Sequence, residues 1–339
     1  MDLSLIKGGG GVKHLFVINP RSFPVSADQD GVLREIQDCF ASFDGEDYSV
    51  HISHYPRYAI GLLGKLIREF QPDETVRVYA VGGDGILFDC LNGIVGLPNV
   101  ELAVVPYGTS NDLMRAFGEG KEAMFRDIRL QAISPVILTD IIHCGNNYAL
   151  NFCTVGIESD TIMKTLDMYN SISHSVRKYR KLNAFVYSML FYVGGTRAVF
   201  NKKILDQHYT ITIDGEDFSG VYGAINIANG PCYGGKLSAV ITAMPNDGVL
   251  DALFFRSAGS FKTALLIPPF TKGEFRRFPK YFTLKQMKKI EIRSDDPLLV
   301  DLDGEAFFDT SLSVEIIPKA VKIVAPGGIE YQRRAGDHE

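Results

Sequence analysis

Acidic residues gather at two glycine-containing turns in the second half of the sequence. The first turn spans residues 246–248 (Asn-Asp-Gly) and is followed by Asp251, and the second spans residues 303–304 (Asp-Gly) between Asp301 and Glu305. A hairpin turn accounts for the glycines, but it does not account for the additional acids. Because carboxylates can accept a proton from a hydroxyl and hold a metal ion, both turns are candidates for phosphoryl-transfer chemistry.

Two glycine-rich turns in the first half of the sequence are suited to binding phosphate. Residues 82–85 (Gly-Gly-Asp-Gly) precede an apolar helical run, so their N–H groups could cradle a phosphate while Asp84 helps to hold Mg²⁺. Residues 107–112 (Tyr-Gly-Thr-Ser-Asn-Asp) offer the Thr109 hydroxyl and the Asn111 amide to nucleotide phosphates. Each turn also has a simpler interpretation, a tight turn for the first and a helix N-cap for the second.

The elements predicted around these turns are those of a parallel α/β sheet. From residue 14 to about residue 132, short β-rich runs alternate with amphipathic helical runs. Ligands of such sheets collect at the carboxyl ends of strands, which is where both glycine-rich turns fall. After Pro135 the pattern changes to the alternating strands of an antiparallel sandwich, with one long helical stretch at about 173–192.

Two other nucleotide motifs are not supported by their context. Residues 230–236 match the first seven positions of a P-loop, but Leu237 replaces the required Ser or Thr and no clear helix follows. No Gly-x-Gly-x-x-Gly segment follows a strand-like run, so a dinucleotide-binding Rossmann site is not expected.

Motifs of two other kinds of site are also missing from the sequence. The histidines lack metal-binding spacing, and no Gly-x-Ser-x-Gly segment, the nucleophile elbow of hydrolases, occurs.

The composition is that of a globular protein with room for two domains. The chain has 339 residues, of which 46% are hydrophobic. Its five cysteines form no Cys-x-x-Cys pair, which argues against a disulfide framework or a thiolate zinc site and favours a reducing cytoplasm. No secretory leader is recognisable, and the most apolar stretch, residues 184–193, is far shorter than the roughly 20 residues that span a bilayer.

Charge is unevenly distributed along the chain. The formal net charge of -5 argues against a nucleic-acid binder. Residues 176–203 nevertheless hold seven Lys and Arg and no acid, and residues 262–289 are rich in Lys and Arg with the single acid Glu274. Each basic zone has two interpretations, a surface that faces anionic lipid headgroups or an ordinary solvated face.

Taken in chain order, six short segments resemble motifs of the diacylglycerol kinase catalytic-domain family, which includes bacterial lipid kinases, sphingosine kinases and ceramide kinases. The most specific is residues 106–112, a close copy of Pro-x-Gly-Thr-x-Asn-Asp. The other segments are residues 19–22 (Asn-Pro-Arg-Ser), 82–85, 229–235, 245–251 and 303–305. Six such segments in the family's order, across most of the chain, identify it as a member of this family.

The resemblance implies a fold of two domains with ATP in the cleft. The first is a three-layer, NAD-kinase-like α/β nucleotide-binding domain, expected at residues 13–134 with a returning C-terminal segment at 319–332. The second is a β-sandwich lipid-binding domain, expected at residues 135–318. By the same resemblance we expect a cytoplasmic protein, peripheral at the inner membrane surface and able to form a homodimer.

The resemblance also implies roles for individual residues. Glu305 is expected to accept the proton, with Asp303 as its partner, and Asp84 to contribute to nucleotide and metal binding. A structural Mg²⁺ is expected at Asp247 and the main-chain oxygens of Met244 and Val249. Contacts to ATP are expected from the following residues: Asn19, Pro20, Arg21, Ser22, Ser53, Gly82, Gly83, Asp84, Gly85, Gly108, Thr109 and Asn111.

The chain departs from the family pattern at five positions. Phe23 replaces the glycine that ends the first loop, and Ile86 replaces the Thr that usually follows Gly-Gly-Asp-Gly. Phe88 and Asp89 stand where Asn and Glu are common, and Lys236 stands where a third glycine is frequent. These departures bear on the substrate more than on the fold, and they leave room for altered use of ATP.

The implied function is ATP- and Mg²⁺-dependent phosphorylation of a lipid hydroxyl, with diacylglycerol or a related lipid as the acceptor. Two alternatives stay open. NAD kinases share the Gly-Gly-Asp-Gly turn and a similar two-domain plan, although they lack the Pro-x-Gly-Thr-x-Asn-Asp run. A non-catalytic nucleotide- or lipid-binding relative is suggested by Phe23 and Ile86.

Overall fold

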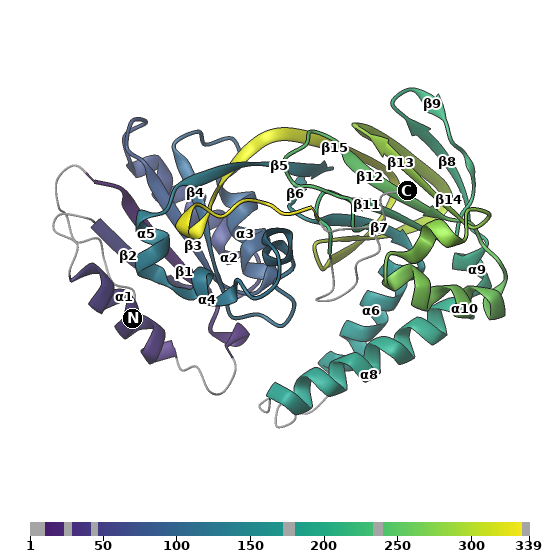
Figure 1. Cartoon of the computed structure of the whole chain (residues 1–339), viewed down its shortest axis with the longest axis horizontal. Coiled ribbons are helices and arrows are strands. Elements are labelled where there is room, and N and C mark those ends of the chain that lie inside the picture. The colour runs from purple at the N-terminus through teal and green to yellow at the C-terminus, as the bar shows by residue number, and fades with distance from the viewer. Residues whose placement is uncertain (1–10, 24–28, 42–46, 172–179, 233–239, 334–339) are drawn as a thin grey trace. The chain divides into compact units, whose positions relative to one another are not determined.

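The computed structural model describes residues 11–23, 29–41, 47–171, 180–232 and 240–333. The chain divides into two compact units, whose elements are labelled in Figure 1. Unit 1 comprises Met1–Asp140 and Lys319–Gln332, and unit 2 comprises Ile141–Pro318 and Arg333–Glu339. Unit 1 is therefore assembled from two segments that lie far apart in the sequence.

A parallel sheet forms the centre of unit 1. Its strands run in the order β2-β1-β3-β4, and the end of β15 adds a parallel strand beside β4. The residues of β1 and β3 are buried throughout, as expected where helices cover both faces of a sheet. The strands are β1 (Lys13–Ile18), β2 (Asp47–Ile52), β3 (Val76–Gly82), β4 (Val100–Pro106) and β15 (Glu305–Val324).

Helices lie on both faces of this sheet, so unit 1 has three layers (Figure 1). On one face, Ile36 of α1 and Ile128 of α5 share a core cluster with Phe16 and Tyr79 of the sheet. The other face is covered by α2 and α3, which pack against each other. The helices are α1 (Gln29–Phe40), α2 (Tyr58–Leu66), α3 (Asp84–Ile94), α4 (Glu122–Arg126) and α5 (Ile128–Ile133). The predicted α/β architecture is confirmed.

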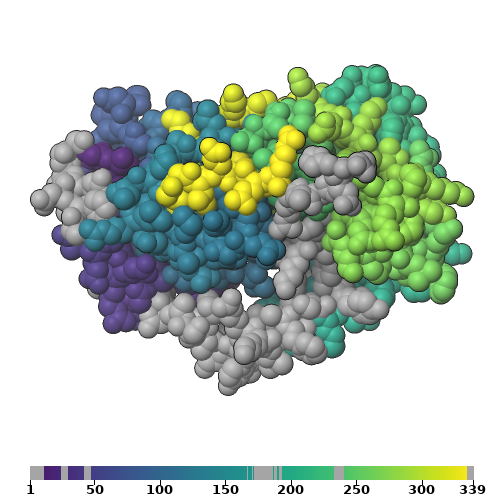
Figure 2. Space-filling model, viewed as in Figure 1, coloured from purple at the N-terminus to yellow at the C-terminus, as the bar shows by residue number. Residues whose placement is uncertain are grey.

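The C-terminal segment of the chain packs on residues 116–135 within unit 1. The backbone N–H of Ala325 donates to the carbonyl of Pro135 at 2.8 Å, and that of Gln332 donates to the carbonyl of Ala116 at 2.7 Å. Figure 2 shows this segment, in yellow, on the surface of the teal part of unit 1. These long-range hydrogen bonds hold the returning segment to the α/β layers.

Antiparallel strands form the centre of unit 2. They run in the order β13-β12-β11-β7-β14, and β8 pairs with the first half of β14. The register of β14 with β15 shifts between Arg293 and Leu298, so one long strand serves two sets of partners, as strands shared by the layers of a sandwich do. The strands are β5 (Val136–Cys144), which begins in unit 1, β6 (Asn147–Ala149), β7 (Phe152–Gly156), β8 (His208–Ile213), β9 (Glu216–Asp217), β10 (Gly220–Val221), β11 (Ala224–Ala228), β12 (Leu250–Phe255), β13 (Phe282–Met287) and β14 (Lys289–Leu302).

Helices of unit 2 pack on one face of these strands in a single core cluster that includes Phe255, Leu266 and Phe270. The helices are α6 (Ile157–Asn170), α8 (Arg180–Val199), α9 (Lys202–Leu205) and α10 (Ser260–Thr271). The predicted helix at about 173–192 is confirmed over residues 180–192, which belong to α8, whereas residues 173–179 lie outside the described residues. The helices α6 and α10 were missed. In α10 the two prolines, Pro268 and Pro269, argue against a helix in the sequence. No helix in the described ranges is both long and apolar enough to cross a membrane.

Candidate active site

The loops that follow β1, β2, β3 and β4 lie at one edge of the unit 1 sheet, because parallel strands end on the same side. The backbone N–H of Asn19 donates to a carbonyl of β3 at 3.0 Å, and that of Ser53 donates to the last carbonyl of β1 at 2.7 Å. The N–H groups of Tyr107 and Gly108 both donate to the carbonyl of Gly82, at 2.7 and 3.0 Å. The predicted nucleotide loops are thus hydrogen-bonded to neighbouring strands and to one another.

Two of these loops touch backbone to backbone at Gly83 and Gly108. A Cβ atom at Gly83 would lie 3.0 Å from the Cα of Gly108, and a Cβ atom at Gly108 would overlap the Cα of Gly83. The loop at residues 19–22 approaches the same place at Gly82, where a Cβ atom would lie 3.1 Å from Ser22 Oγ. Only glycine permits this close approach, so three of the motifs found in the sequence meet in unit 1.

The carboxylate of Asp84 links the Gly-Gly-Asp-Gly turn to the loop at residues 107–112. Its two oxygens accept the backbone N–H groups of Asn111 at 2.9 Å and Asp112 at 2.8 Å. Burial raises the pKa of the Asp84 carboxyl above its ordinary value, and the two N–H groups oppose this rise because they stabilise the anion. Asp84 therefore fixes the shape of the neighbouring loop.

Asn111 closes its loop through its own side chain. Its backbone is left-handed, with φ of +49°. Its Oδ1 accepts the N–H of Gly108 at 3.1 Å, and its Nδ2 donates to the carbonyl of Gly108 at 2.9 Å. Thr109, at the tip of this loop, and Gly85, in the first turn of α3, are exposed. The amide of Asn111 thus shapes the loop, while Thr109 is open to solvent.

The first loop is a short 3-10 turn, η1 (Pro20–Ser22), capped by Asn19, whose Oδ1 accepts the N–H of Arg21 at 3.1 Å. Phe23 follows directly, and its ring packs edge-on against Tyr107 at a centroid distance of 4.6 Å. A glycine at position 23 could not make this contact. The departure from the family pattern at Phe23 therefore ties the first loop to the loop at 107–112.

Ile86 also has a packing role that its position in the motif did not reveal. It is buried, and its Cγ2 lies 2.8 Å from the place that a Cβ atom on Gly82 would occupy. Ile86 thus fills the space beneath the glycine turn, where the family pattern has a hydroxyl. Lys236, the fifth departure, lies outside the described residues.

In unit 2, residues 303–304 form a two-residue hairpin turn between β14 and β15. Asp303 and Gly304 have φ of +51° and +91°, as a type I′ turn requires. The buried carboxylate of Asp303 accepts the backbone N–H groups of residues 150–152, at 2.7, 3.1 and 2.9 Å. Glu305 is the first residue of β15 and is partly exposed. Asp303 therefore anchors the turn that presents Glu305.

Asp301 belongs to a buried polar row that was not predicted from the sequence. Thr154 lies opposite Asp301 on β7, Asn226 lies opposite Thr154 on β11, and each of the three is at most 1% exposed. Burial, reinforced by the negative charges of Asp303 and Glu305, raises the pKa of Asp301 to about 7. The only sequence signal for this row is a single polar residue within an apolar run, as at Asn226.

Asp247 lies in an exposed turn of unit 2. Its Oδ1 accepts the backbone N–H of Val249 at 3.3 Å, and Met244 precedes it in the same loop. Within the part of the chain that the structure describes, no three His, Cys, Asp or Glu side chains are placed to hold a metal ion together. A carboxylate with main-chain oxygens is nevertheless a donor set that suits Mg²⁺ chemically, so a Mg²⁺ site at this turn stays a prediction.

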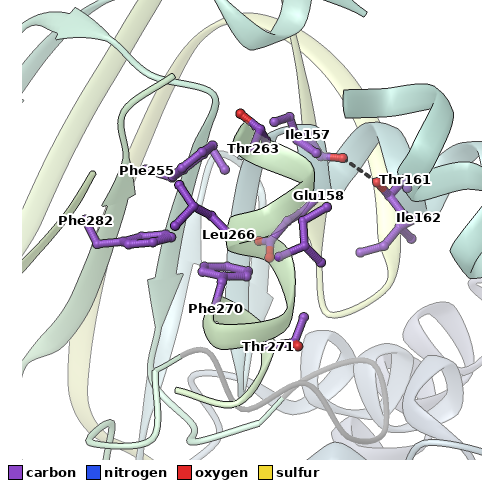
Figure 3. Close-up of a pocket in the computed structure, with 13 residues that line it drawn as sticks. Ile157, Glu158, Thr161, Ile162, Phe255, Thr263, Leu266, Phe270, Thr271 and Phe282 are labelled. Atoms are coloured by element: carbon purple, nitrogen blue, oxygen red, sulfur yellow. Dashed lines mark hydrogen bonds between the residues drawn. The ribbon is translucent and has the colours of Figure 1, made fainter. Parts of the chain in front are cut away.

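An apolar pocket lies in unit 2 between α6, α10 and the sheet (Figure 3). Its walls include Ile162, Phe255, Leu266 and Phe270, and among the described residues that line it Glu158 is the only ionisable one. Two of its three threonines turn their hydroxyls to their own helices: Thr161 donates to the carbonyl of Ile157 at 2.7 Å and Thr271 to that of Pro268 at 3.0 Å. The pocket therefore offers mainly hydrocarbon surface to a ligand. No motif in the sequence predicted this pocket.

The predicted site residues fall into two sets, one in each unit. Comparison with known protein families finds two models that match the chain. The model for the diacylglycerol kinase catalytic domain matches residues 13–140. The model for the YegS C-terminal NAD kinase beta sandwich-like domain matches residues 172–325. The two matches together cover most of the chain, which belongs to the diacylglycerol kinase-like family.

Individual relatives and solved structures agree with this assignment. A protein of Staphylococcus haemolyticus, provisionally named a lipid kinase, is 27% identical over 262 residues, which are 76% of this chain and 78% of that protein. A crystal structure of a diacylglycerol kinase from Bacillus anthracis has a TM-score of 0.66 at 19% identity, and covers 94% of this chain and 98% of that one. A second Bacillus anthracis structure, provisionally given the same name, has a TM-score of 0.69 at 22% identity, with 94% and 96% covered. These likenesses show the fold, an NAD-kinase-like α/β domain with a β-sandwich domain.

Proposed function

We propose that this protein transfers the γ-phosphoryl group of ATP to the hydroxyl of a lipid, diacylglycerol or a chemically related one. The observation that carries the proposal is the meeting of three loops, two of them glycine-rich, at the carboxyl edge of the unit 1 sheet, where Gly82, Gly83 and Gly108 allow their close approach. Loops of this kind bring backbone N–H groups close to phosphate oxygens. Membership of a kinase family supports the same reaction class.

In this proposal unit 1 binds the nucleotide. The loop at 82–85 contacts the phosphates through backbone N–H groups, the loop at 19–22 lies beside it and is expected to contact the nucleotide, and the exposed residue Thr109 contributes its hydroxyl. Ser53, at the end of β2, lies at the same edge of the sheet and is expected to contact the nucleotide. Asp84 and Asn111 act mainly by holding the loop at 107–112 in shape, since their side chains are bonded to that loop.

In the same proposal unit 2 binds the lipid whose hydroxyl accepts the phosphoryl group. Glu305 accepts the proton of the lipid hydroxyl, and Asp303 holds the hairpin turn that carries Glu305. The oxygens of Asp247, Met244 and Val249 would hold a structural Mg²⁺, while Mg²⁺ on the nucleotide would neutralise phosphate charge. The apolar pocket beside α10 supports a hydrocarbon chain as part of the substrate. A lipid of this kind resides in a membrane, so the protein would work at a membrane surface.

The test is a labelling assay with purified protein, Mg²⁺, γ-labelled ATP, a lipid panel and NAD. We expect a labelled lipid, and we expect Glu305→Gln to lower the rate by about 10²- to 10⁴-fold, the usual contribution of a general base. Glu291→Gln is the matched control, because Glu291 is exposed on β14 and its carboxylate pairs with Lys289. Labelled NAD without labelled lipid would favour the NAD kinase-like alternative. Binding of ATP without any turnover would favour the non-catalytic one.

A further inference from the structure

The outer face of α10 is apolar and open to solvent. Thr263, Leu266 and Phe270 of this helix are buried, whereas Phe261 is 78% and Leu265 is 63% exposed. A helix at the surface of a soluble protein normally carries polar residues on its outer face. Here that face carries two large hydrophobic side chains one helical turn apart, so it is suited to contact with an apolar partner.

Lys and Arg residues are concentrated in the stretch that includes α10 and the sequence on either side of it. Lys262 is the only charged residue within α10, and Lys272 follows directly after it. From residue 256 to residue 289 the sequence has nine Lys and Arg and one acid, Glu274, which is itself paired with Arg277 at 2.7 Å. Two further cations of this stretch pair with acids, Lys285 with Glu216 and Lys289 with Glu291, so the cations relevant to α10 are those within the helix and close to it in the fold.

The fold gathers some of these cations beside the first turn of α10. The ammonium groups of Lys262 and Lys280 lie 4.8 and 5.9 Å from the ring centre of Tyr281. Tyr281 is thus flanked by one cation from the helix and one from the segment after it. Because Phe261 precedes Lys262 in the same turn, an exposed aromatic ring and two ammonium groups share one region of the surface.

The inner face of the same helix lines the apolar pocket. Figure 3 shows Leu266 and Phe270 of α10 facing Phe255 and Phe282 of the sheet around that pocket. One short helix therefore presents hydrocarbon surface in two directions, inward to the pocket and outward to solvent. A partner on its outer face would lie directly beside the pocket wall.

We propose that the outer face of α10 is a membrane-docking surface for a bilayer rich in anionic phospholipid. Phe261 and Leu265 insert among the acyl chains, while Lys262, Lys272 and Lys280 contact the headgroups. A bilayer is the occupant because it combines an apolar layer with a layer of negative charge, which matches the apolar residues and the cations around them. Docking at this face does not depend on the proposed lipid kinase function. Only the further statement, that docking places the pocket next to its lipid substrate, rests on that function.

The chain lacks tryptophan, which provides a direct test. Phe261→Trp introduces a single tryptophan on the proposed surface, and Ile133→Trp introduces one at a similarly exposed position in unit 1, where Ile133 is 68% exposed. We expect vesicles of phosphatidylcholine and phosphatidylserine to shift the tryptophan fluorescence of the Phe261→Trp protein to shorter wavelength, less so at high salt. The Ile133→Trp protein should show no shift. Absence of the shift in the Phe261→Trp protein would overturn the inference.

A second measurement separates docking from catalysis. In vesicle sedimentation, the double variant Phe261→Ser, Leu265→Ser should bind anionic vesicles about tenfold or more weakly than the wild type, and Lys272→Glu should weaken binding and its salt dependence. Ile133→Ser is the control and should bind normally. On a short-chain lipid dispersed as monomers, the double variant should keep its kinase rate. Because sedimentation needs no ATP, it remains informative even if no lipid is phosphorylated.

The competing occupant is a second copy of the chain. If the fluorescence of the Phe261→Trp protein shifts with protein concentration alone, and vesicles add nothing, then the α10 face binds another copy of this protein and the membrane proposal is wrong. If the double variant and the Ile133→Ser control lose vesicle binding equally, the surface responsible lies elsewhere, which also contradicts the proposal.

Discussion

Arg57, the residue before α2, is bound through its backbone N–H and its guanidinium to the carboxylate of Asp89 in α3. The N–H of Arg57 donates to Asp89 Oδ2 at 2.8 Å, and its guanidinium lies 3.4 Å from Oδ1. The same guanidinium lies 4.4 Å above the ring of Phe88. Two residues that depart from the family pattern, Phe88 and Asp89, thus share one partner. Arg57 has φ of +67°, a strained backbone conformation for a residue other than glycine, and the bond to Asp89 stabilises it.

Replacement of Asp89 should therefore destabilise unit 1. Asp89→Ala leaves the backbone N–H of Arg57 without its carboxylate, which we expect to lower the free energy of unfolding by about 1–3 kcal/mol in urea denaturation. Asp73→Ala, at an exposed position, should change it by less than about 0.5 kcal/mol. Equal effects of the two substitutions would contradict the role given to Asp89.

The contact between Gly83 and Gly108 makes a second prediction. Gly108→Ala should weaken ATP binding and destabilise the protein by about 1–3 kcal/mol, because the added methyl group overlaps the Cα of Gly83. Gly61→Ala is the matched control: its methyl group would meet no atom within 4 Å in α2, so we expect a gain of roughly 0.5–1 kcal/mol. For each variant, calorimetric titration measures the affinity for ATP, and urea denaturation measures the free energy of unfolding. Normal ATP affinity in the Gly108→Ala protein would show that the loops need not touch.

The carboxylate of Asp303 should be required for the fold of unit 2. Asp303→Ala removes the acceptor of the N–H groups of residues 150–152, and we expect it to cost about 3 kcal/mol or more, since several charge-assisted hydrogen bonds are lost at a buried site. Hydrogen exchange should show loss of protection at residues 150–152. A variant that keeps this protection would contradict the proposed anchoring role.

The titration of Asp301 makes stability depend on pH. The pKa of this carboxyl is about 7 in the folded protein and 3.8 when unperturbed, so between these values the folded state binds more protons than the unfolded state. The free energy of unfolding should therefore fall as pH rises from about 4 to 7, by up to roughly 4 kcal/mol. Asp301→Asn cannot ionise, so its stability should lack this decline. Parallel pH profiles for the two proteins would rule out the buried carboxyl as the cause.

The pocket predicts a dependence on acyl-chain length. A Cβ atom at Gly195 would lie 3.7 Å from Thr161 Cγ2, an ordinary contact, and the further methyl groups of valine in Gly195→Val should narrow the pocket. We expect a rise in KM for long-chain lipids of about tenfold and little change for short-chain ones. Gly64→Val, in α2 of unit 1, is the control. An equal rise for both chain lengths would place the hydrocarbon chain elsewhere.

The sequence by itself determined the α/β pattern and the loops on which the kinase assignment depends. Alternation of β-rich and amphipathic runs is a local property, so the strands at residues 13–18 and 76–82 could be recognised without a structure. The turns at 82–85 and 107–112 could be placed at the carboxyl edge because parallel strands fix that edge. The order of the motifs then identified the family.

Only the tertiary structure decided what those residues contact. Asp84 was expected to help hold Mg²⁺, but its oxygens accept N–H groups 27 and 28 positions further along the chain. Asp303 bonds residues more than 150 positions earlier, and the row from Asp301 to Asn226 exists only because strand register brings three strands together. Hydrogen bonds and packing between distant segments depend on how strands pair and helices pack, which local periodicity does not specify. For the same reason, the apolar pocket and the exposed face of α10 could not be found from the sequence.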